Sequence, residues 1–253
     1  MNTARLAVVT GASKGIGRGI AVKLASIGYE ILVNYGGDRA GAEETVRMIS
    51  GVGSQAWIFQ ADVGDRDQMQ AMFDFVVDRA GIPDIQVNNA GVQTWKPLLE
   101  LTDSEWDRTI RTNLKGAFLG TQLAARLMVE HQRKGRIINI GSGCNKVPFP
   151  NLVDYTSSKG GIEMLTRVSA VELGPYGITV NCVAPGAIEI ERTKEEAHDY
   201  AGTWAPLTPC RRVGQVEDVA EAVAYLVSDA AEFVTAQTLY VDGGAFSQGP
   251  WPY

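Results

Sequence analysis

The sequence is poor in the residues that bind metals or form disulfide bonds. Its 253 residues include only three cysteines (Cys144, Cys182 and Cys210) and two histidines, and the cysteines show no metal-ligand spacing. We therefore predict neither a metal site nor a disulfide framework, and this cysteine usage is typical of a reduced compartment.

Long hydrophobic runs and blocks of like charge are also absent from the sequence. No run reaches the roughly 18 apolar residues of a membrane span, and the first residues lead straight into a strand-like run, so no signal peptide is expected. The formal net charge is −6 with Lys and Arg scattered along the chain, which argues against a nucleic-acid partner. We predict a soluble cytoplasmic protein that acts on a small molecule.

The chain does have a repeating β–α pattern. Short apolar runs occur at 6–9, 31–33, 56–59, 85–87, 136–140, 178–183 and 238–241. Helical patterns lie between them at 16–27, 40–49, 67–79, 104–129, 155–173 and 216–226. Apolar strands that alternate with helices predict an α/β fold with a doubly wound parallel sheet, and the length suits one domain covering 1–253.

Two segments depart from this pattern. Residues 187–214 form a long stretch rich in charge, proline and aromatics, which predicts a substrate lid because long irregular segments in compact domains are usually functional. The aromatic C-terminal segment 248–253 is expected to pack on a neighbouring subunit.

A glycine-rich turn follows the first expected strand. Its spacing, Gly-x-x-x-Gly-x-Gly, differs from the general dinucleotide fingerprint, and a plain tight turn is the alternative. A glycine turn between a first strand and a helix nevertheless lets backbone N–H groups approach a pyrophosphate. The predicted cofactor contacts in this turn are Gly11, Ser13, Lys14, Gly15, Ile16 and Gly17.

The end of the second expected strand indicates the choice of cofactor. An NAD site usually has an acidic residue about 20 positions beyond the turn. This strand instead ends at Asn34 and Tyr35, both predicted cofactor contacts, and no carboxylate follows until Asp38. Lys14 and Arg39 are candidates to bind a 2′-phosphate. NADP(H) is therefore the preferred cofactor, with NAD(H) as the alternative.

Two further residues are predicted at the adenine. Asp62 and Val63 follow the third expected strand, where an aspartate can accept from the adenine amine. Aspartates in loops are as often turn residues.

Tyr155 and Lys159 form the most informative pair in the chain. Their spacing of four places them on one helical face. A phenol has a reference pKa of about 10, and a neighbouring ammonium lowers that pKa by stabilising the phenolate. Ser142, at the end of an apolar run, is expected to hold the reacting oxygen. Together these residues predict acid–base chemistry on an alcohol or a carbonyl.

Six motifs occur in the order and approximate spacing of the short-chain dehydrogenase/reductase family. They are Thr10-Gly11-x-x-x-Gly15-Ile16-Gly17, Asn88-Asn89-Ala90-Gly91, Asn113, Ser142, Tyr155-x-x-x-Lys159 and Pro185-Gly186. The chain resembles this family over nearly its whole length. The resemblance implies a Rossmann-type fold, a nicotinamide cofactor and a homotetramer.

The resemblance also implies a role for each residue. Tyr155 is expected to be the general acid/base, and Lys159 to lower the Tyr155 pKa and bind the nicotinamide ribose. Ser142 is expected to orient the reacting oxygen, and Asn113 to hold a relay water. The remaining implied cofactor contacts are Asn89, Ala90, Gly91, Pro185, Gly186 and Ile188.

Two positions depart from the family pattern. Ile190 stands where the family commonly has a threonine that bonds the carboxamide, and Thr193 is a possible substitute. Gly141 replaces the small hydroxyl residue often found before the catalytic serine.

The substrate is the least determined part of the prediction. The candidate substrate contacts are Gln93, Ser142, Cys144, Asn145, Glu189 and Trp204. Their largely polar character favours a compact polyhydroxy or otherwise polar substrate, with Trp95 and Trp204 as apolar walls.

Three functions follow from these predictions. The first is an NADP(H)-dependent carbonyl reductase or alcohol dehydrogenase similar to 3-oxoacyl-carrier-protein reductase-like members. The second is a sugar or polyol dehydrogenase working oxidatively. The third is a non-enzymatic dinucleotide sensor, against which the complete set Asn113, Ser142, Tyr155 and Lys159 argues.

Overall fold

Seven parallel strands form one sheet in the computed structural model, which describes residues 5–191, 193 and 198–247. The strands are β1 (Arg5–Val9), β2 (Tyr29–Tyr35), β3 (Ala56–Gln60), β4 (Ile85–Asn88), β5 (Gly135–Ile140), β6 (Ile178–Pro185) and β7 (Thr238–Val241). Their order is β3-β2-β1-β4-β5-β6-β7, and every neighbouring pair is parallel. The predicted doubly wound α/β fold is confirmed.

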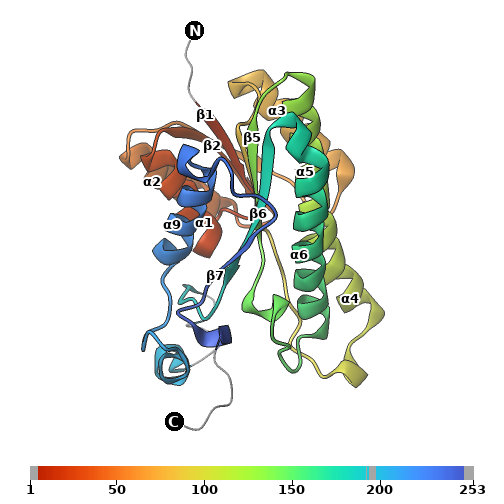
Figure 1. Cartoon of the computed structure of the whole chain (residues 1–253), viewed down its shortest axis with the longest axis vertical. Coiled ribbons are helices and arrows are strands. Elements are labelled where there is room, and N and C mark those ends of the chain that lie inside the picture. The colour runs from red at the N-terminus through yellow and green to blue at the C-terminus, as the bar shows by residue number, and fades with distance from the viewer. Residues whose placement is uncertain (1–4, 192, 194–197, 248–253) are drawn as a thin grey trace.

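Helices cover both faces of the sheet (Figure 1). One face carries α1 (Gly15–Ser26), α2 (Arg39–Gly51) and α9 (Val216–Val227). The other carries α3 (Arg66–Ala80), α4 (Asp103–Thr109), α5 (Gly116–Glu130) and α6 (Val153–Leu173). A short helix, α8 (Tyr200–Trp204), lies beyond the carboxyl end of the sheet.

Strand alternation divides the core between the two layers. Ala7 and Val9 of β1 join the cluster beneath α1 and α9, whereas Leu6 and Val8 join the cluster beneath α3 and α5. This follows from the period of two in a strand, which sends successive side chains to opposite faces. Burial on both sides explains why the strands read as continuous apolar runs.

The strand order reverses between β1 and β4. The N–H of Thr10, just after β1, donates to the carbonyl of Val87 in β4 at 3.0 Å, and the Thr10 hydroxyl accepts from the N–H of Asn89 at 2.9 Å. The glycine turn and the segment after β4 are therefore neighbours at the carboxyl ends of their strands. In open α/β sheets, ligands bind at this kind of switch point.

The helix predicted at 104–129 is interrupted, which corrects the prediction. A π-helical segment, Ile110–Lys115, separates α4 from α5. Single π-helical turns inside α-helices are frequent at functional sites. Here the segment carries Asn113, whose side chain is buried.

The predicted lid leaves and rejoins the body of the protein at one place. Ile188 pairs with Gly214 in an isolated parallel bridge, and the Glu189 N–H donates to the Gly214 carbonyl at 2.9 Å. The segment between them is thus a loop with adjacent ends, and it contains α8. The predicted subunit contact of residues 248–253 lies outside the described residues.

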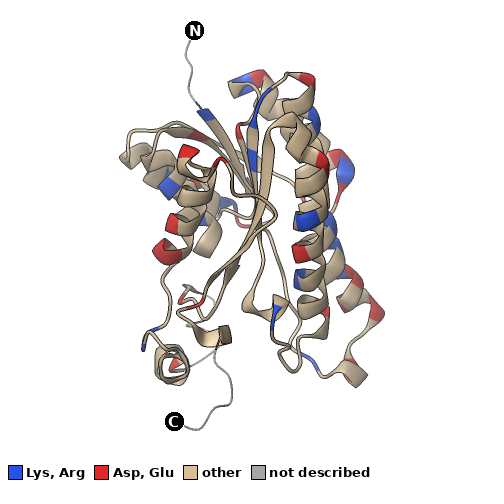
Figure 2. Cartoon of the chain, in the orientation of Figure 1, with Lys and Arg blue, Asp and Glu red and all other residues tan. Residues whose placement is uncertain are grey.

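Charged side chains of both signs are interspersed along the outer helices, whereas the sheet is largely uncharged (Figure 2). None of the helices in the described part of the chain has the length and apolar character needed to cross a bilayer.

Candidate active site

A cavity of about 1400 Å³ lies at the carboxyl ends of the central strands. Its volume exceeds that of an ordinary drug-sized pocket, so it has room for a dinucleotide and a substrate together. The predicted site residues that line it are Gly11, Ser13, Lys14, Gly15, Ile16, Gly17, Asn34, Asp62, Val63, Asn89, Ala90, Gly91, Gln93, Ser142, Cys144, Tyr155, Lys159, Pro185, Gly186, Ile188 and Trp204.

Four residues predicted to contact a ligand do not line this cavity, and their contacts stay predictions: Tyr35, Arg39, Asn145 and Glu189. Tyr35 belongs to the buried core, because it follows Asn34 on β2 and so points to the opposite face. Asn145 turns back to bond the main chain of Ser142. Glu189 lines a smaller pocket beside α1 and α9.

The glycine turn leaves backbone open to the cavity. Gly11 and Gly15 adopt φ values of +62° and +54°, a left-handed conformation that favours glycine. A Cβ on Gly11 would also lie 2.8 Å from the Cα of Ala90, and one on Gly17 would overlap the amide of Asn89. The first turn of α1 contains no acidic residue, so the helix N-terminus offers its dipole to an anion.

Two asparagines hold this turn in place. Asn34 accepts from the Gly11 N–H at 3.1 Å and donates to the Ala61 carbonyl at 3.1 Å. Asn89 donates to the carbonyls of Thr10 and Gly11 at 2.9 and 3.0 Å. The path of the turn is therefore fixed by hydrogen bonds to these two side chains.

The charged residues predicted to lie near the adenosine differ in their positions. Lys14 is exposed and lines the cavity. Asp62 lines it too, but its carboxylate is paired with Arg111 of the π-helical segment. Arg39 lies outside the cavity and pairs with Glu43 at 2.8 Å, so of the two predicted cations only Lys14 faces the site.

Glu191, in the segment predicted to be a lid, brings a carboxylate close to the glycine turn. A Cβ on Gly15 would lie 3.8 Å from Oε2 of Glu191, and the Arg18 guanidinium lies 3.5 Å from Glu191 Oε1. Arg18 therefore offsets a negative charge that would otherwise disfavour a phosphate.

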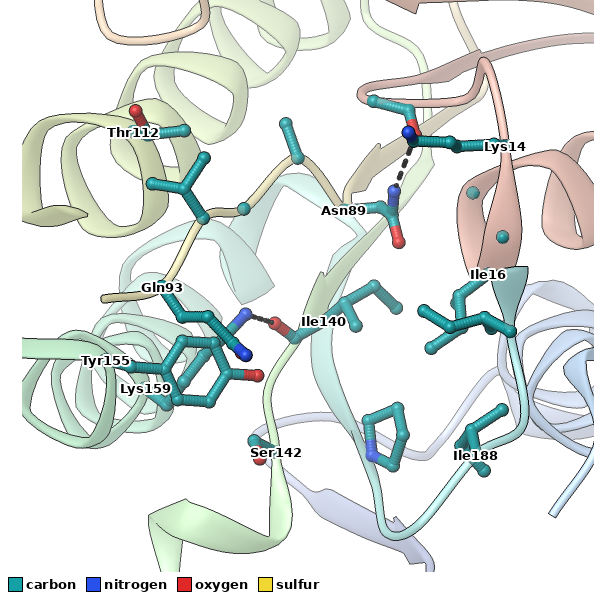
Figure 3. A pocket seen from close by; sticks show the side chains of 18 of the residues that line it. Lys14, Ile16, Asn89, Gln93, Thr112, Ile140, Ser142, Tyr155, Lys159 and Ile188 are labelled. Atoms are coloured by element: carbon teal, nitrogen blue, oxygen red, sulfur yellow. Dashed lines mark hydrogen bonds between the residues drawn. The ribbon is translucent and has the colours of Figure 1, made fainter. Parts of the chain in front are cut away.

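Helix α6 positions the tyrosine–lysine pair. The Lys159 ammonium lies 5.4 Å from the centroid of the Tyr155 ring and donates to the carbonyl of Ile140 at 2.7 Å. Figure 3 shows this hydrogen bond, with Lys159 behind the tyrosine ring and Ser142 on the loop that follows β5. Lys159 is 4% exposed, so its charge acts on its neighbours with little screening by solvent.

Asn113 lies behind the cavity and ties three segments together. Its Oδ1 accepts from the Val92 N–H at 2.8 Å, while its Nδ2 donates to the Val92 carbonyl at 2.9 Å and to Ser158 Oγ at 3.0 Å. The Ser158 hydroxyl in turn donates to the Tyr155 carbonyl at 2.7 Å. The side chain of Asn113 thus braces the first turns of α6, and its role in a water relay stays a prediction.

Ser142 is oriented by the turn that follows it. Its Oγ accepts from the Cys144 N–H at 3.2 Å, and its own N–H donates to Asn145 Oδ1 at 3.2 Å. A hydroxyl carries one hydrogen, so accepting from Cys144 leaves that hydrogen available for a substrate oxygen.

The glycine at position 141 has a steric cause. A Cβ there would lie 2.6 Å from Sγ of Cys182 and 2.8 Å from Nδ2 of Asn145. Burial raises the pKa of the Cys182 thiol to about 11, so this neighbour is a neutral filler. Gly141 therefore departs from the family pattern because Cys182 and Asn145 fill the space that a larger side chain would need beside Ser142.

Ile190, the second departure, packs against the core cluster beneath α1. The Thr193 hydroxyl accepts from the Ile190 N–H at 2.9 Å and lines the cavity. Its contact with the carboxamide stays a prediction.

Some lining residues were missed at the level of sequence, among them Phe149, Leu152 and Phe246. Phe149 lies seven residues after Ser142, so proximity to a known motif was an available signal. Phe246 comes from the C-terminal end of the described chain, and no local motif marks it.

The comparisons with known proteins agree with this geometry. A family profile described as enoyl-(acyl carrier protein) reductase matches residues 11–245. A 3-oxoacyl-(acyl-carrier-protein) reductase of Staphylococcus aureus is 42% identical over 246 residues, covering 97% of this chain and 100% of that protein. The 3beta-hydroxysteroid dehydrogenase 1 of Eggerthella lenta is 41% identical over 239 residues, covering 94% and 92%.

A solved structure is similar over almost the full length. The putative gluconate dehydrogenase from Agrobacterium tumefaciens superposes with a TM-score of 0.92 at 35% identity, covering 97% of each chain. The chain therefore belongs to the short-chain dehydrogenase/reductase family, and it is a nicotinamide-dependent oxidoreductase that interconverts carbonyl and alcohol groups.

Proposed function

We propose that the protein is an NADP(H)-dependent carbonyl reductase or alcohol dehydrogenase in which Tyr155 is the general acid/base. The observation that carries this proposal is the buried Lys159 ammonium, 5.4 Å from the centroid of the Tyr155 ring, in the cavity that also contains Ser142 and the glycine turn. The catalytic and cofactor-binding roles of the individual residues are part of the proposal.

The residues of the chain supply orientation and one proton. A bound nicotinamide exchanges the hydride. During reduction, Tyr155 donates its hydroxyl proton to the carbonyl oxygen, and during oxidation the phenolate removes the proton of the alcohol. The Lys159 charge stabilises the phenolate, while Ser142 donates to the same substrate oxygen and fixes its position.

The preference for NADP(H) rests on the end of β2. The amide of Asn34 is engaged with Gly11 and Ala61, and the carboxylate of Asp38 caps α2 by accepting from the Gly41 N–H at 2.9 Å. Of the two cations predicted for the 2′-phosphate, Lys14 lines the cavity. We assign the 2′-phosphate to Lys14, and NAD(H) is the weaker cofactor.

We also infer a homotetramer in the cytoplasm. The exposed apolar residues Met164, Val168 and Val171 on α6 support assembly. The three cysteines are free thiols, in keeping with a reduced compartment.

Tyr155→Phe tests the proposed chemistry. We expect NADPH binding, followed by cofactor fluorescence, to match the unmodified protein, because the ring and Lys159 remain. Turnover of a ketone should fall by about 10²- to 10⁴-fold, since the proton donor is removed.

Substantial turnover by this variant would overturn the role of Tyr155. If the unmodified protein binds NADPH but turns over no carbonyl compound from a broad panel, the sensor alternative gains support. Absence of binding to NADPH and NADH would contradict the cofactor assignment.

A further inference from the structure

We propose that the substrate is a ketone, or the matching secondary alcohol, whose unreactive part is an uncharged hydrophobic ring system. This inference rests on the proposed function and names the substrate class of that site. It comes from an aromatic wall, defined as Trp95, Phe149, Tyr200 and Trp204, that lines the catalytic cavity.

The wall is a continuous row of rings. The centroids of Trp95 and Phe149 lie 5.7 Å apart with the rings edge to face, those of Phe149 and Trp204 lie 5.9 Å apart, and those of Tyr200 and Trp204 lie 6.2 Å apart. These separations fall in the range of favourable aromatic contacts. The four side chains therefore form one surface.

Three separate segments contribute to this surface. Trp95 follows β4, Phe149 precedes α6, and Tyr200 and Trp204 belong to α8 in the predicted lid. Ser142 and Tyr155 line the same cavity. A ligand bound at Ser142 and Tyr155 would therefore contact aromatic side chains from the segments after β4 and before α6 and from α8.

Within the wall, Trp95 has an exposed surface that a ligand could cover. Trp95 is 50% exposed, although indole is among the side chains that gain most from leaving water. A hydrophobic ring placed against it would bury that surface.

The cavity near the serine is also apolar. Phe246 packs so closely against Gly143 that a Cβ at position 143 would overlap its ring. Leu152 lines the cavity as well. An apolar substrate thus finds hydrophobic groups beside the catalytic centre as well as along the wall.

Charged groups lie away from the wall among the described lining residues. Lys14 and Asp62 are at the adenosine end, and Lys159 bonds the Ile140 carbonyl. Glu191 is over the glycine turn, beside Arg18. An anionic substrate would find no partner at the wall, and burying its charge there would be costly.

The wall argues against the polar substrate expected from sequence. Asn145 and Glu189, two of the groups on which that expectation rested, lie outside the cavity, whereas Gln93 lines it. A sugar could stack its C–H face on the rings, but the ring faces would not pair with its hydroxyls, and unpaired hydroxyls cost affinity. We therefore infer a hydrocarbon ring rather than a sugar.

The test compares 2-tetralone with acetoin and a ketose, each reduced with NADPH. We expect kcat/KM to be at least tenfold higher for 2-tetralone. Replacing Trp95 or Trp204 by Leu should raise KM for 2-tetralone about tenfold with kcat nearly unchanged, because an aromatic contact is worth up to about one factor of ten. KM for acetoin, which has no ring to lose a contact, should rise much less than KM for 2-tetralone.

Trp106→Leu is the matched control, since this tryptophan lies on α4 and does not line the cavity. This substitution should leave kcat/KM unchanged for 2-tetralone, acetoin and the ketose. Equal kcat/KM for 2-tetralone and acetoin, a preference for the ketose, or equal losses on both ketones in the wall variants would each overturn the inference while leaving the proposed function intact.

Binding without turnover separates the two proposals. In the Tyr155→Phe protein saturated with NADPH, 2-tetralone should quench tryptophan fluorescence, and the quenching should weaken in a Trp95→Leu background. No quenching would overturn the aromatic site. If 2-tetralone quenches the fluorescence of the unmodified protein but no ketone is reduced, the result would instead count against the proposed function.

Discussion

At the scale of single residues, side-chain hydrogen bonds hold the backbone of the glycine turn. The hydroxyl of Thr10 accepts from the N–H groups of Asn89 and Ala90 at 2.9 and 3.1 Å and donates to the Val87 carbonyl at 3.3 Å. With Asn34, these bonds fix the path of the backbone on both sides of the switch point. A fixed turn lowers the entropy that a bound dinucleotide must lose.

Lys14→Ala is expected to change the choice of cofactor. Losing one charge-assisted contact to the 2′-phosphate should raise KM for NADPH by about tenfold, while KM for NADH stays within about twofold. Steady-state kinetics with both cofactors measure this. Arg39→Ala is the control, because Arg39 lies outside the cavity and pairs with Glu43. Equal losses with NADPH and NADH would contradict the assignment of Lys14.

Residue types and spacing predicted the catalytic pair but not the direction of every side chain. Tyr155 and Lys159 could be predicted because a spacing of four has one geometric consequence on a helix. The directions of the Asn145 and Glu189 side chains could not be predicted, because both residues lie in irregular segments. There, contacts with residues distant in sequence, such as the one between Asn145 and Cys182, set the direction of a side chain.

At the scale of elements, the start of α6 is held by a buried carboxylate. Asp154, which is fully buried, accepts from Thr109 Oγ1 at 2.7 Å and from the Tyr155 N–H at 2.7 Å. Leu152, the N-cap residue of α6, provides no side-chain cap, so Asp154 takes over part of this task. It also joins α4 to α6 beside the π-helical segment.

Asp154→Ala should destabilise the protein by about 2 kcal/mol, because it leaves a buried hydroxyl and a backbone N–H without their acceptor. For a domain of this size the melting temperature should fall by roughly 4–8 °C. Differential scanning calorimetry measures the change. Asp154→Asn, which keeps an acceptor oxygen, should lose less. An alanine variant as stable as the unmodified protein would show that the carboxylate does not brace α6.

At the scale of the whole molecule, the outer face of α6 is unusually apolar. Met164, Val168 and Val171 are 56%, 49% and 76% exposed. Their spacing of four and three places them on one face of the helix. An exposed apolar stripe of this kind marks a protein–protein contact, and we expect copies of this chain to pack there.

For the homotetramer proposed above, in which the α6 face is one of the contacts, sedimentation should show a species of four times the 27.2 kDa chain mass. Val168→Glu should shift it to smaller species, because a buried unpaired carboxylate is costly. Met48→Glu on α2, where Met48 is 42% exposed, is the control and should keep the assembly. A monomeric unmodified protein, or an unchanged Val168→Glu assembly, would contradict this packing.

The amino-acid sequence by itself determined the α/β class, the parallel sheet, the family and the placement of Lys159 beside Tyr155. It did so because alternation, helical spacing and short motifs are local, and each has one consistent structural solution. Only the tertiary structure decided how the single helix expected at 104–129 is broken by a π-helical turn, where Asn145 and Glu189 point, and that Trp95, Phe149, Tyr200 and Trp204 form one wall. These features join segments far apart in the chain, and their contacts exist only after folding.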